Sequence, residues 1–414
     1  MDLIRGKLAV LTGGGSGIGR ELVVQLAAAG CSVATCDVSE PALAETAARA
    51  LAGAPAGTRV STHACDVSDE ASVGRFRDEV LERHATDRVD LLFNNAGIAG
   101  VGSFVVDDRA EWERVFDVCW GGVYRCTRAF LPLLCASERA WLVNTSSVNG
   151  FWATNGPGIP STAYSAAKFA VKGFSEALIE DLRLHAPHVH VAVVMPGFVS
   201  TPIALNSARV IGGGRLDAVR AMLVKLGLPV ANAGDDELPR IVAALDELDE
   251  DLAPTSAPAA ARAILDGLRA GHWRILVGDD AHRIDAAVRA DPDAAYDPGF
   301  TGLERGWFRP MLLLRALFDP RADRGLAASY ELRDGEDRIA VRIAGGQLAI
   351  ARRLAAAPDA TLDVAPHALV ALLAGERTLD EAVRRGELTL AGDRAAVERL
   401  LAVVAPPRRD GGAS

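Results

Sequence analysis

The sequence of 414 residues lacks long apolar runs, an excess of positive charge and paired cysteine motifs. Its formal net charge of −10 disfavours nucleic acid and anionic membranes as partners, because both attract basic surfaces. No apolar run approaches the about 20 residues that span a bilayer, and charges interrupt the first seven residues, where a secretory signal is apolar. The six cysteines show neither Cys-x-x-Cys nor a matching histidine spacing. We therefore expect reduced thiols, no metal site, no membrane span and a cytoplasmic protein.

Length and composition favour a globular protein of two domains, since 50% of the residues are hydrophobic and 24% are charged. From residue 8 to about 200, short apolar runs alternate with helical patterns, which predicts a doubly wound α/β fold with a parallel sheet. This first domain is expected to cover residues 1–297, up to a linker rich in Asp-Pro. Strands are expected at 8–11, 32–36, 60–65, 90–93, 140–144, 189–194 and 273–277, and helices at 19–29, 115–134, 162–184 and 257–270.

The alternation weakens between residues 202 and 254. This segment contains the glycine run 212–214, an apolar stretch at 222–226 and an acidic run at 246–251. It is interpreted either as a surface insertion with a solvated acidic helix or as a lid over the substrate, because long loops at this edge of such sheets cover ligands.

Beyond the linker, residues 298–414 are expected to form a smaller α+β domain. Period-2 alternation at 329–333 and 338–343 flanks Asp334-Gly335, and a further strand at 347–352 follows Gly345-Gly346, so two hairpins are predicted. A helix around 366–374, a strand at 387–391 and a helix at 394–403 complete the prediction.

A glycine-rich turn follows the first expected strand. Residues 12–19 read Thr-Gly-Gly-Gly-Ser-Gly-Ile-Gly and lead directly into a helix. Glycines at such a turn let the backbone approach a pyrophosphate and direct helix amide groups toward it. A tight turn without a ligand would also explain glycine, but the position between strand and helix is the one that dinucleotide binding requires.

Tyr164 and Lys168 form a second informative pattern, because both residue types are rare. The chain holds four tyrosines and four lysines, so a chance Tyr-x-x-x-Lys is expected only about 0.04 times. Four residues apart on a helix, the two side chains share a face. A phenol with an ordinary pKa of about 10 is a poor base at neutral pH, and a nearby cation favours its phenolate form. The pair is thus suited to proton transfer.

The spacing Gly-x-x-x-Gly-x-Gly resembles that of the short-chain dehydrogenase/reductase family. The resemblance extends in order through Asp66-Val67, Asn94-Asn95-Ala96-Gly97, Ser146-Ser147, Tyr164 to Lys168 and Pro196-Gly197, and covers about residues 5–290. It implies a Rossmann-type fold and an NAD(P)-dependent enzyme that interconverts a secondary alcohol and a ketone. The implied catalytic residues are Ser147, Tyr164 and Lys168, with Tyr164 moving the hydroxyl proton, Lys168 holding the nicotinamide ribose and Ser147 orienting the reacting oxygen.

Asp37 ends the second expected strand, where a carboxylate can accept both ribose hydroxyls of NAD and would repel a 2′-phosphate. NAD is therefore expected rather than NADP, although a helix cap would also explain this aspartate. The resemblance implies further contacts along the adenine, beneath the cofactor and beside the nicotinamide. The full expected set of cofactor-binding residues is Gly13, Ser16, Gly17, Ile18, Gly19, Asp37, Asp66, Val67, Asn94, Ala96, Gly97, Tyr164, Lys168, Pro196, Gly197, Val199 and Thr201.

One position departs from the family pattern. Many members carry Asp-Val-Asn on the long helix before the fifth strand, whereas this chain has Asp117-Val118-Cys119. A thiol is a weak hydrogen-bonding group, so the proton relay that the asparagine serves in relatives is expected to be modified or weakened.

The second domain resembles the sterol-carrier-protein-2-like fold in its order of elements and in its ending, Gly-Glu-Leu-Thr-Leu-Ala-Gly-Asp at 386–393. That resemblance implies a hydrophobic, steroid-like or lipid-like substrate, although the apolar residues also suit an ordinary core. The alternative function is an NAD-binding sensor or a lipid-binding protein with little catalytic activity. Relatives pair through the helices at 115–134 and 162–184, so a homodimer or homotetramer is expected.

Overall fold

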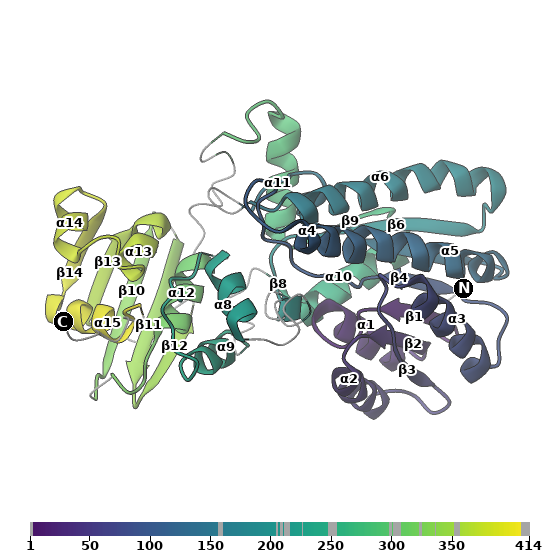
Figure 1. Cartoon of the computed structure of the whole chain (residues 1–414), viewed down its shortest axis with the longest axis horizontal. Coiled ribbons are helices and arrows are strands. Elements are labelled where there is room, and N and C mark those ends of the chain that lie inside the picture. The colour runs from purple at the N-terminus through teal and green to yellow at the C-terminus, as the bar shows by residue number, and fades with distance from the viewer. Residues whose placement is uncertain are drawn as a thin grey trace. The chain divides into compact units, whose positions relative to one another are not determined.

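Figure 1 shows the computed structural model of the chain, which folds into two compact units. Of the described residues, those up to Asn155, from Pro160 to Ser207 and from Thr255 to Ala295 form the first unit, and the others form the second. No helix within these described parts is long and apolar enough to cross a membrane. The described residues are 3–155, 160–203, 206–207, 210, 216–225, 227–246, 255–297, 300, 308–322, 325–335, 337–351 and 357–406.

The first unit is built on a parallel sheet of seven strands in the order β3-β2-β1-β4-β5-β6-β9, so the predicted Rossmann-type fold is confirmed. The strand order reverses between β1 and β4, and ligands of such sheets bind outside the carboxyl ends of the strands at this point. The strands are β1 (Leu8–Thr12), β2 (Ser32–Asp37), β3 (Val60–Ala64), β4 (Leu91–Asn94), β5 (Ala140–Thr145), β6 (Val189–Pro196) and β9 (Arg274–Val277).

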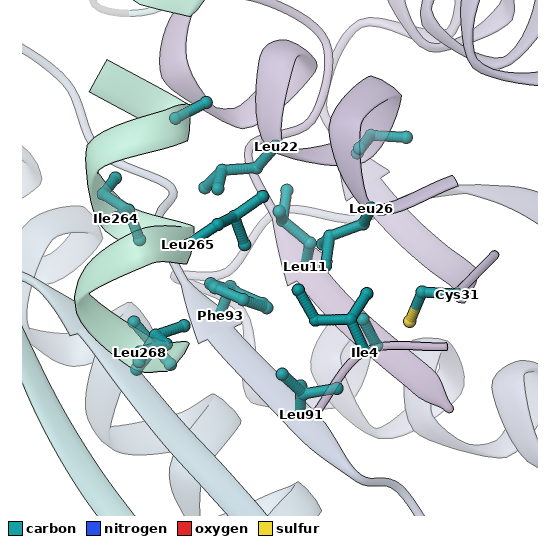
Figure 2. Packing of buried hydrophobic residues seen from close by; sticks show 14 of the residues in the cluster. Ile4, Leu11, Leu22, Leu26, Cys31, Leu91, Phe93, Ile264, Leu265 and Leu268 are labelled. Atoms are coloured by element: carbon teal, nitrogen blue, oxygen red, sulfur yellow. The ribbon is translucent and has the colours of Figure 1, made fainter. Parts of the chain in front are cut away.

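Helices cover both faces of this sheet (Figure 1). One layer consists of α1 (Gly17–Ala28), α2 (Glu40–Ala52) and α10 (Ala257–Arg269), and the other of α3 (Glu70–His84), α5 (Gly122–Cys135) and α6 (Thr162–His185). Figure 2 shows Leu265 of α10 directed toward Leu22 of α1, with Phe93 of β4 beside it. These buried contacts fix α1, and with it the glycine-rich turn, against the sheet.

The helix predicted over 115–134 is interrupted, which corrects the prediction. Helix α4 (Arg109–Phe116) passes into a π-helical turn at Asp117–Gly121 before α5 begins. Two consecutive glycines, Gly121 and Gly122, weaken the α-helix here, and a Cβ at Gly122 would lie 2.7 Å from Val67 Cγ2. This π-helical turn holds one residue more than an α-helical turn, which changes the direction in which Cys119 points.

The second unit contains a mixed sheet in the order β12-β11-β10-β13-β14. Both predicted hairpins are confirmed, because β10 pairs antiparallel with β11 and β11 with β12. Strand β13 was not predicted; it lies parallel to β10 and brings β14 into the sheet. The elements are α12 (Phe308–Leu317), β10 (Ala328–Asp334), β11 (Asp337–Ala344), β12 (Gln347–Ala351), β13 (Ala360–Val364), α13 (Pro366–Leu373), α14 (Leu379–Arg384), β14 (Leu388–Gly392) and α15 (Arg394–Val403).

The segment between residues 202 and 254 is divided between the units. Its two ends are held together in the first unit, where β7 (Val199–Ser200) pairs parallel with β8 (Thr255–Ser256). Its helices α8 (Leu216–Lys225) and α9 (Leu238–Asp246) belong to the second unit. There α9 packs against α12, and Leu238 and Ile241 are fully buried. The glycine run 212–214 and the acidic residues 247–251 lie outside the described residues.

Candidate functional site

The glycine-rich turn connects β1 to α1 at the reversal of strand order. Gly13 has a φ of +75°, and a Cβ there would lie 2.7 Å from Ala96 Cα. Gly17 has a φ of +52° and faces Thr201, while a Cβ at Gly19 would lie 2.0 Å from the Gly13 carbonyl oxygen. Only glycine fits these positions, so the turn lies flat against the ends of β1 and β4.

The amino end of α1 is open to an anion. Ser16 occupies the N-cap position, but its side chain makes no capping hydrogen bond within the described structure, and the first turn carries no acidic residue. The amide groups at this end and the helix dipole therefore favour a phosphate. Together with the closely packed glycines, these features fit the pyrophosphate of a dinucleotide.

Thr12 and Asn95 fix the turn, and neither was among the expected site residues. The Thr12 hydroxyl accepts hydrogen bonds from the Asn95 and Ala96 backbone amides, both at 3.0 Å. The Asn95 side-chain amide donates to the Thr12 carbonyl at 3.2 Å. Asn94 instead points into the core, where its amide donates to Thr127 and Asn144, so only its backbone is available to a cofactor.

Asp37 lies at the carboxyl end of β2, directly beside the turn. Its Oδ2 accepts a hydrogen bond from the Gly15 amide at 2.9 Å, and its Oδ1 accepts one from the Ser39 amide at 3.1 Å. The carboxylate thus lies directly beside the glycine-rich turn, and its contact with the ribose hydroxyls stays a prediction.

Asp66 and Val67 follow β3 on the same edge of the sheet. Burial alone would raise the pKa of Asp66, but hydrogen bonds from Ser68 and Arg114 outweigh it and hold the pKa below its usual range. Arg114 Nη2 donates to Asp66 Oδ2 at 2.8 Å across 48 residues of sequence. This arginine, on α4, was not expected at the site, because nothing in the local sequence indicates the contact.

The three expected catalytic residues come together. Ser147 follows β5, whereas Tyr164 and Lys168 lie one turn apart on α6, with the Lys168 ammonium 5.3 Å from the centre of the Tyr164 ring. Lys168 is buried and donates to the Thr145 carbonyl at 2.9 Å. The Ser147 hydroxyl accepts from the Asn149 amide at 3.2 Å and donates to Asn149 Oδ1 at 3.3 Å, and it lies close enough to Tyr164 to lower the pKa of the phenol.

Burial and the charge of Lys168 act in opposite directions on the pKa of Tyr164. Burial raises the pKa of the Tyr164 phenol, and the Lys168 charge and the Ser147 hydrogen bond offset this only in part. The effect expected of Lys168 is present but is outweighed, because a buried phenolate loses its hydration. At neutral pH Tyr164 is therefore a neutral phenol that can donate a proton.

Cys119 lies fully buried in the same region. Its thiol donates to the Ile98 carbonyl at 3.3 Å. A Cβ built at Gly97 would lie 3.6 Å from Lys168 Nζ and 3.7 Å from Cys119 Sγ, so the thiol and the ammonium border the same glycine. The thiol therefore stands near Lys168, but it has only one weak donor.

The residues expected beside the nicotinamide form the loop after β6. The Gly197 amide donates to the Val277 carbonyl at 2.9 Å, Val199 lies in β7, and Thr201 packs against Gly17. The loop therefore reaches from the end of the sheet to the glycine-rich turn. Among the described residues, no group of three or more His, Cys, Asp or Glu side chains is arranged to hold a metal ion.

Comparison with known proteins agrees with this geometry. Residues 7–209 match the short chain dehydrogenase family. The putative oxidoreductase SadH of Mycobacterium tuberculosis is 34% identical over 289 residues, which are 70% of this chain and 92% of the relative. The chain belongs to the short-chain dehydrogenase/reductase family. It is an NAD(P)-dependent oxidoreductase.

Solved structures extend the comparison. A short-chain dehydrogenase/reductase from Burkholderia phymatum in complex with NAD is 31% identical, with a TM-score of 0.56 over 71% of this chain and 95% of that one. Levodione reductase is 26% identical, with a TM-score of 0.51 over 66% of this chain and 97% of that one. Residues 320–410 match the alkyl sulfatase C-terminal family, a sterol-carrier-protein-2-like fold.

Proposed function

We propose that this protein interconverts a secondary alcohol and a ketone with NAD, and that Ser147, Tyr164 and Lys168 carry the reaction. The observation that carries the proposal is their convergence: two neighbouring residues of α6 meet a serine after β5, beside the glycine-rich turn. Sixteen residues separate Ser147 from Tyr164 in the chain, so only the tertiary structure brings them together.

In this mechanism Tyr164 moves the proton. Bound NAD would supply the hydride acceptor and, when reduced, the hydride donor. During reduction the neutral phenol donates its proton to the developing alkoxide; during oxidation the phenolate accepts the hydroxyl proton. Lys168 stabilises the phenolate by its charge, and Ser147 donates a hydrogen bond to the substrate oxygen and holds it toward Tyr164.

We infer NAD rather than NADP as the preferred cofactor. The Asp37 carboxylate beside Gly15 can accept hydrogen bonds from both ribose hydroxyls, and it would repel a 2′-phosphate. The relative from Burkholderia phymatum is in complex with NAD, which supports this choice. The remaining cofactor-binding residues in the proposal are those expected from the sequence, with Asn94 acting through its backbone.

The segment after Thr201 is proposed to act as the substrate lid. Its first described residues already contact the cofactor region, because Asn206 Nδ2 donates to Ser16 Oγ at 3.1 Å and Ser207 Oγ accepts from the Ala99 amide at 2.7 Å. Pairing of β7 with β8 brings the segment back to the same edge of the sheet.

A hydrophobic, steroid-like or lipid-like substrate is proposed from the sterol-carrier-like second domain.

The assembly and compartment are also proposals. Tyr124 on α5 and Phe169 on α6 are exposed aromatic residues on the two helices through which the sequence resemblance implies pairing, which supports a homodimer or homotetramer. All six cysteines are free, which supports a reducing, cytoplasmic environment.

A substrate screen tests the proposed activity against the alternative of an NAD-binding sensor with little catalysis. Hydroxysteroids, long-chain secondary alcohols and small diols are incubated with NAD, and NADH formation is followed by its absorbance. An oxidoreductase gives saturable turnover with at least one class, and a sensor binds NAD but gives none. Turnover with NADP alone would contradict the proposed cofactor.

A further inference from the structure

Asp280 is a buried carboxyl group that the proposed mechanism does not use. It is the second residue of α11 (Asp279–Ala290) and follows β9, and only 2% of it is exposed. A buried carboxyl group is costly unless hydrogen bonds compensate for its lost hydration. The buried carboxyl group of Asp280 therefore requires a hydrogen-bond donor as its partner.

That partner is the loop after β6. Asp280 Oδ2 accepts a hydrogen bond from the Phe198 backbone amide at 2.7 Å, across 82 residues of sequence. The preceding residue must be glycine, because a Cβ at Gly197 would lie 2.2 Å from Oδ2 and 2.4 Å from Cγ. The loop backbone thus lies directly on the carboxyl group.

The other carboxyl oxygen is oriented differently. Asp280 Oδ1 is buried and has no hydrogen-bond partner among the described residues. A Cβ at Gly278, whose φ is +96°, would lie 2.5 Å from this oxygen and 2.6 Å from Thr255 Oγ1. Two glycines therefore make room for this side chain. Gly197 lies on the loop that Asp280 holds, and Gly278 directly precedes α11.

We propose that Asp280 is a positioning residue that fixes the Gly197–Phe198 backbone and so sets the nicotinamide half of the cofactor site. The inference rests on the proposed function, in which Pro196, Gly197, Val199 and Thr201 border the nicotinamide. Asp280 acts through the loop and is separate from Asp37 and Asp66, which would hold the adenosine half. Its loss therefore weakens binding at one end of the dinucleotide only.

Burial is consistent with this role. Burial raises the pKa of Asp280, and hydrogen bonds from backbone amides, that of Phe198 foremost, offset part of the increase. The loop and the carboxyl group thus stabilise each other, because the amide that Asp280 positions is also the group that favours its charged form.

The test compares affinities for NAD, NADH and ADP-ribose, measured by calorimetry without substrate. For Asp280→Ala we expect the affinities for NAD and NADH to fall about ten-fold, the effect of one lost hydrogen bond to a carboxylate, and that for ADP-ribose to change less than two-fold. Asp280→Asn keeps an acceptor for the Phe198 amide and is expected to bind like the wild type. Asp279→Ala removes an exposed carboxylate from the same helix end and is the matched control.

Several outcomes would overturn the inference. Equal weakening of ADP-ribose would indicate general destabilisation, and weakening of NAD alone would indicate attraction of the charged nicotinamide rather than positioning. A loss in Asp279→Ala as large as in Asp280→Ala would also contradict it. Should Asp280→Ala not fold, Gly197→Ala displaces the same loop and must show the same selective loss. Wild-type protein that binds neither NAD nor ADP-ribose would instead overturn the proposed function.

Discussion

At the scale of single residues, Asp37 is the basis of the proposed preference for NAD over NADP. Both carboxylate oxygens already accept backbone hydrogen bonds, from Gly15 and Ser39, so the group is held in place before any ligand binds. Because this acceptor is already fixed, little conformational entropy is lost when a ribose binds to it. A 2′-phosphate in the same place would be repelled by the fixed negative charge.

Replacing Asp37 with alanine is predicted to reverse the cofactor preference. Loss of hydrogen bonds from the ribose to a carboxylate costs about 1.5–3 kcal/mol, so kcat/KM with NAD should fall roughly 10- to 100-fold. kcat/KM with NADP should rise, because the repulsion is removed. Steady-state kinetics with both cofactors measures this. The control is Glu40→Ala, which removes an exposed acid three residues further along; an equal loss there would contradict the assignment.

Cys119 stands where many relatives carry an asparagine, and we expect it to weaken the proton path. The variant Cys119→Asn restores a side chain with both donor and acceptor groups and is predicted to raise kcat about five-fold, the effect of about 1 kcal/mol from one hydrogen bond. The affinity for NADH should not change. Cys119→Ser is the control, because it offers a hydroxyl of similar reach and should give less gain. Unchanged or lower turnover in Cys119→Asn would show that the thiol is not limiting.

The sequence predicted some of these residues and not others for a physical reason. Tyr164 and Lys168 are four residues apart on a helix, so their shared face follows from local geometry. Arg114 and Asp280 meet their partners across 48 and 82 residues, and no local pattern encodes such contacts. The sequence revealed the cationic neighbour that lowers the pKa of Tyr164 but not the burial that raises it, because burial is a property of the tertiary structure.

At the scale of elements, hydrogen-bonded polar side chains that include two buried histidines join β3 to α3. The Ser61 hydroxyl lies 2.9 Å from His63 Nε2 and 2.8 Å from His84 Nε2, and His63 Nδ1 lies 2.7 Å from Glu79. Burial, reinforced by the charge of Arg59, lowers the pKa of His84 from 6.5 to about 4. These hydrogen-bonded side chains therefore require a neutral His84.

The lowered pKa of His84 predicts a specific loss of stability in acid. Above pH 6.5 His84 is neutral in both the folded and the unfolded protein and adds no pH dependence. As the pH falls from 6.5 toward 4, the unfolded chain binds a proton that the folded one does not, so the free energy of unfolding decreases. His84→Gln should flatten Tm against pH in this range. The exposed His185→Gln should not, and an unchanged slope in His84→Gln would contradict the account.

The elements themselves were predicted where local signals are strong. Asp334-Gly335 and Gly345-Gly346 mark both hairpins, because their glycines adopt positive φ. Strand β13 was missed, since its five residues, Ala-Thr-Leu-Asp-Val, give too short a pattern of alternation. The π-helical turn at Asp117–Gly121 was missed because a continuous apolar pattern does not reveal one extra residue in a turn.

At the scale of the whole molecule, the chain order and the compact units do not coincide. Helices α8 and α9 lie between β7 and β8 in sequence, yet they belong to the second unit with α12. Within that unit Arg240 on α9 donates to the Phe318 carbonyl. The sequence showed only a weakening pattern here, because which partner an apolar helix face buries is decided by tertiary structure.

Two thermal transitions are predicted by calorimetry, and NAD should raise only one of them. A ligand that binds the folded first unit at about 100 times its Kd stabilises it by about 2.7 kcal/mol. Ile241→Ala, in α9, should lower the transition that NAD does not shift, whereas Leu265→Ala, in α10, should lower the one that it does. If Ile241→Ala lowered the NAD-responsive transition instead, the assignment of α9 to the second unit would be wrong.

The central claim is that Tyr164 transfers the proton during an NAD-dependent reaction. The most direct measurement compares wild type and Tyr164→Phe for turnover of the substrate found in the screen and for NADH affinity by calorimetry. The account predicts that the phenylalanine variant loses turnover by a factor of about 10²–10⁴ while its Kd for NADH stays within about two-fold. Turnover that persists in Tyr164→Phe with NADH still bound would contradict it.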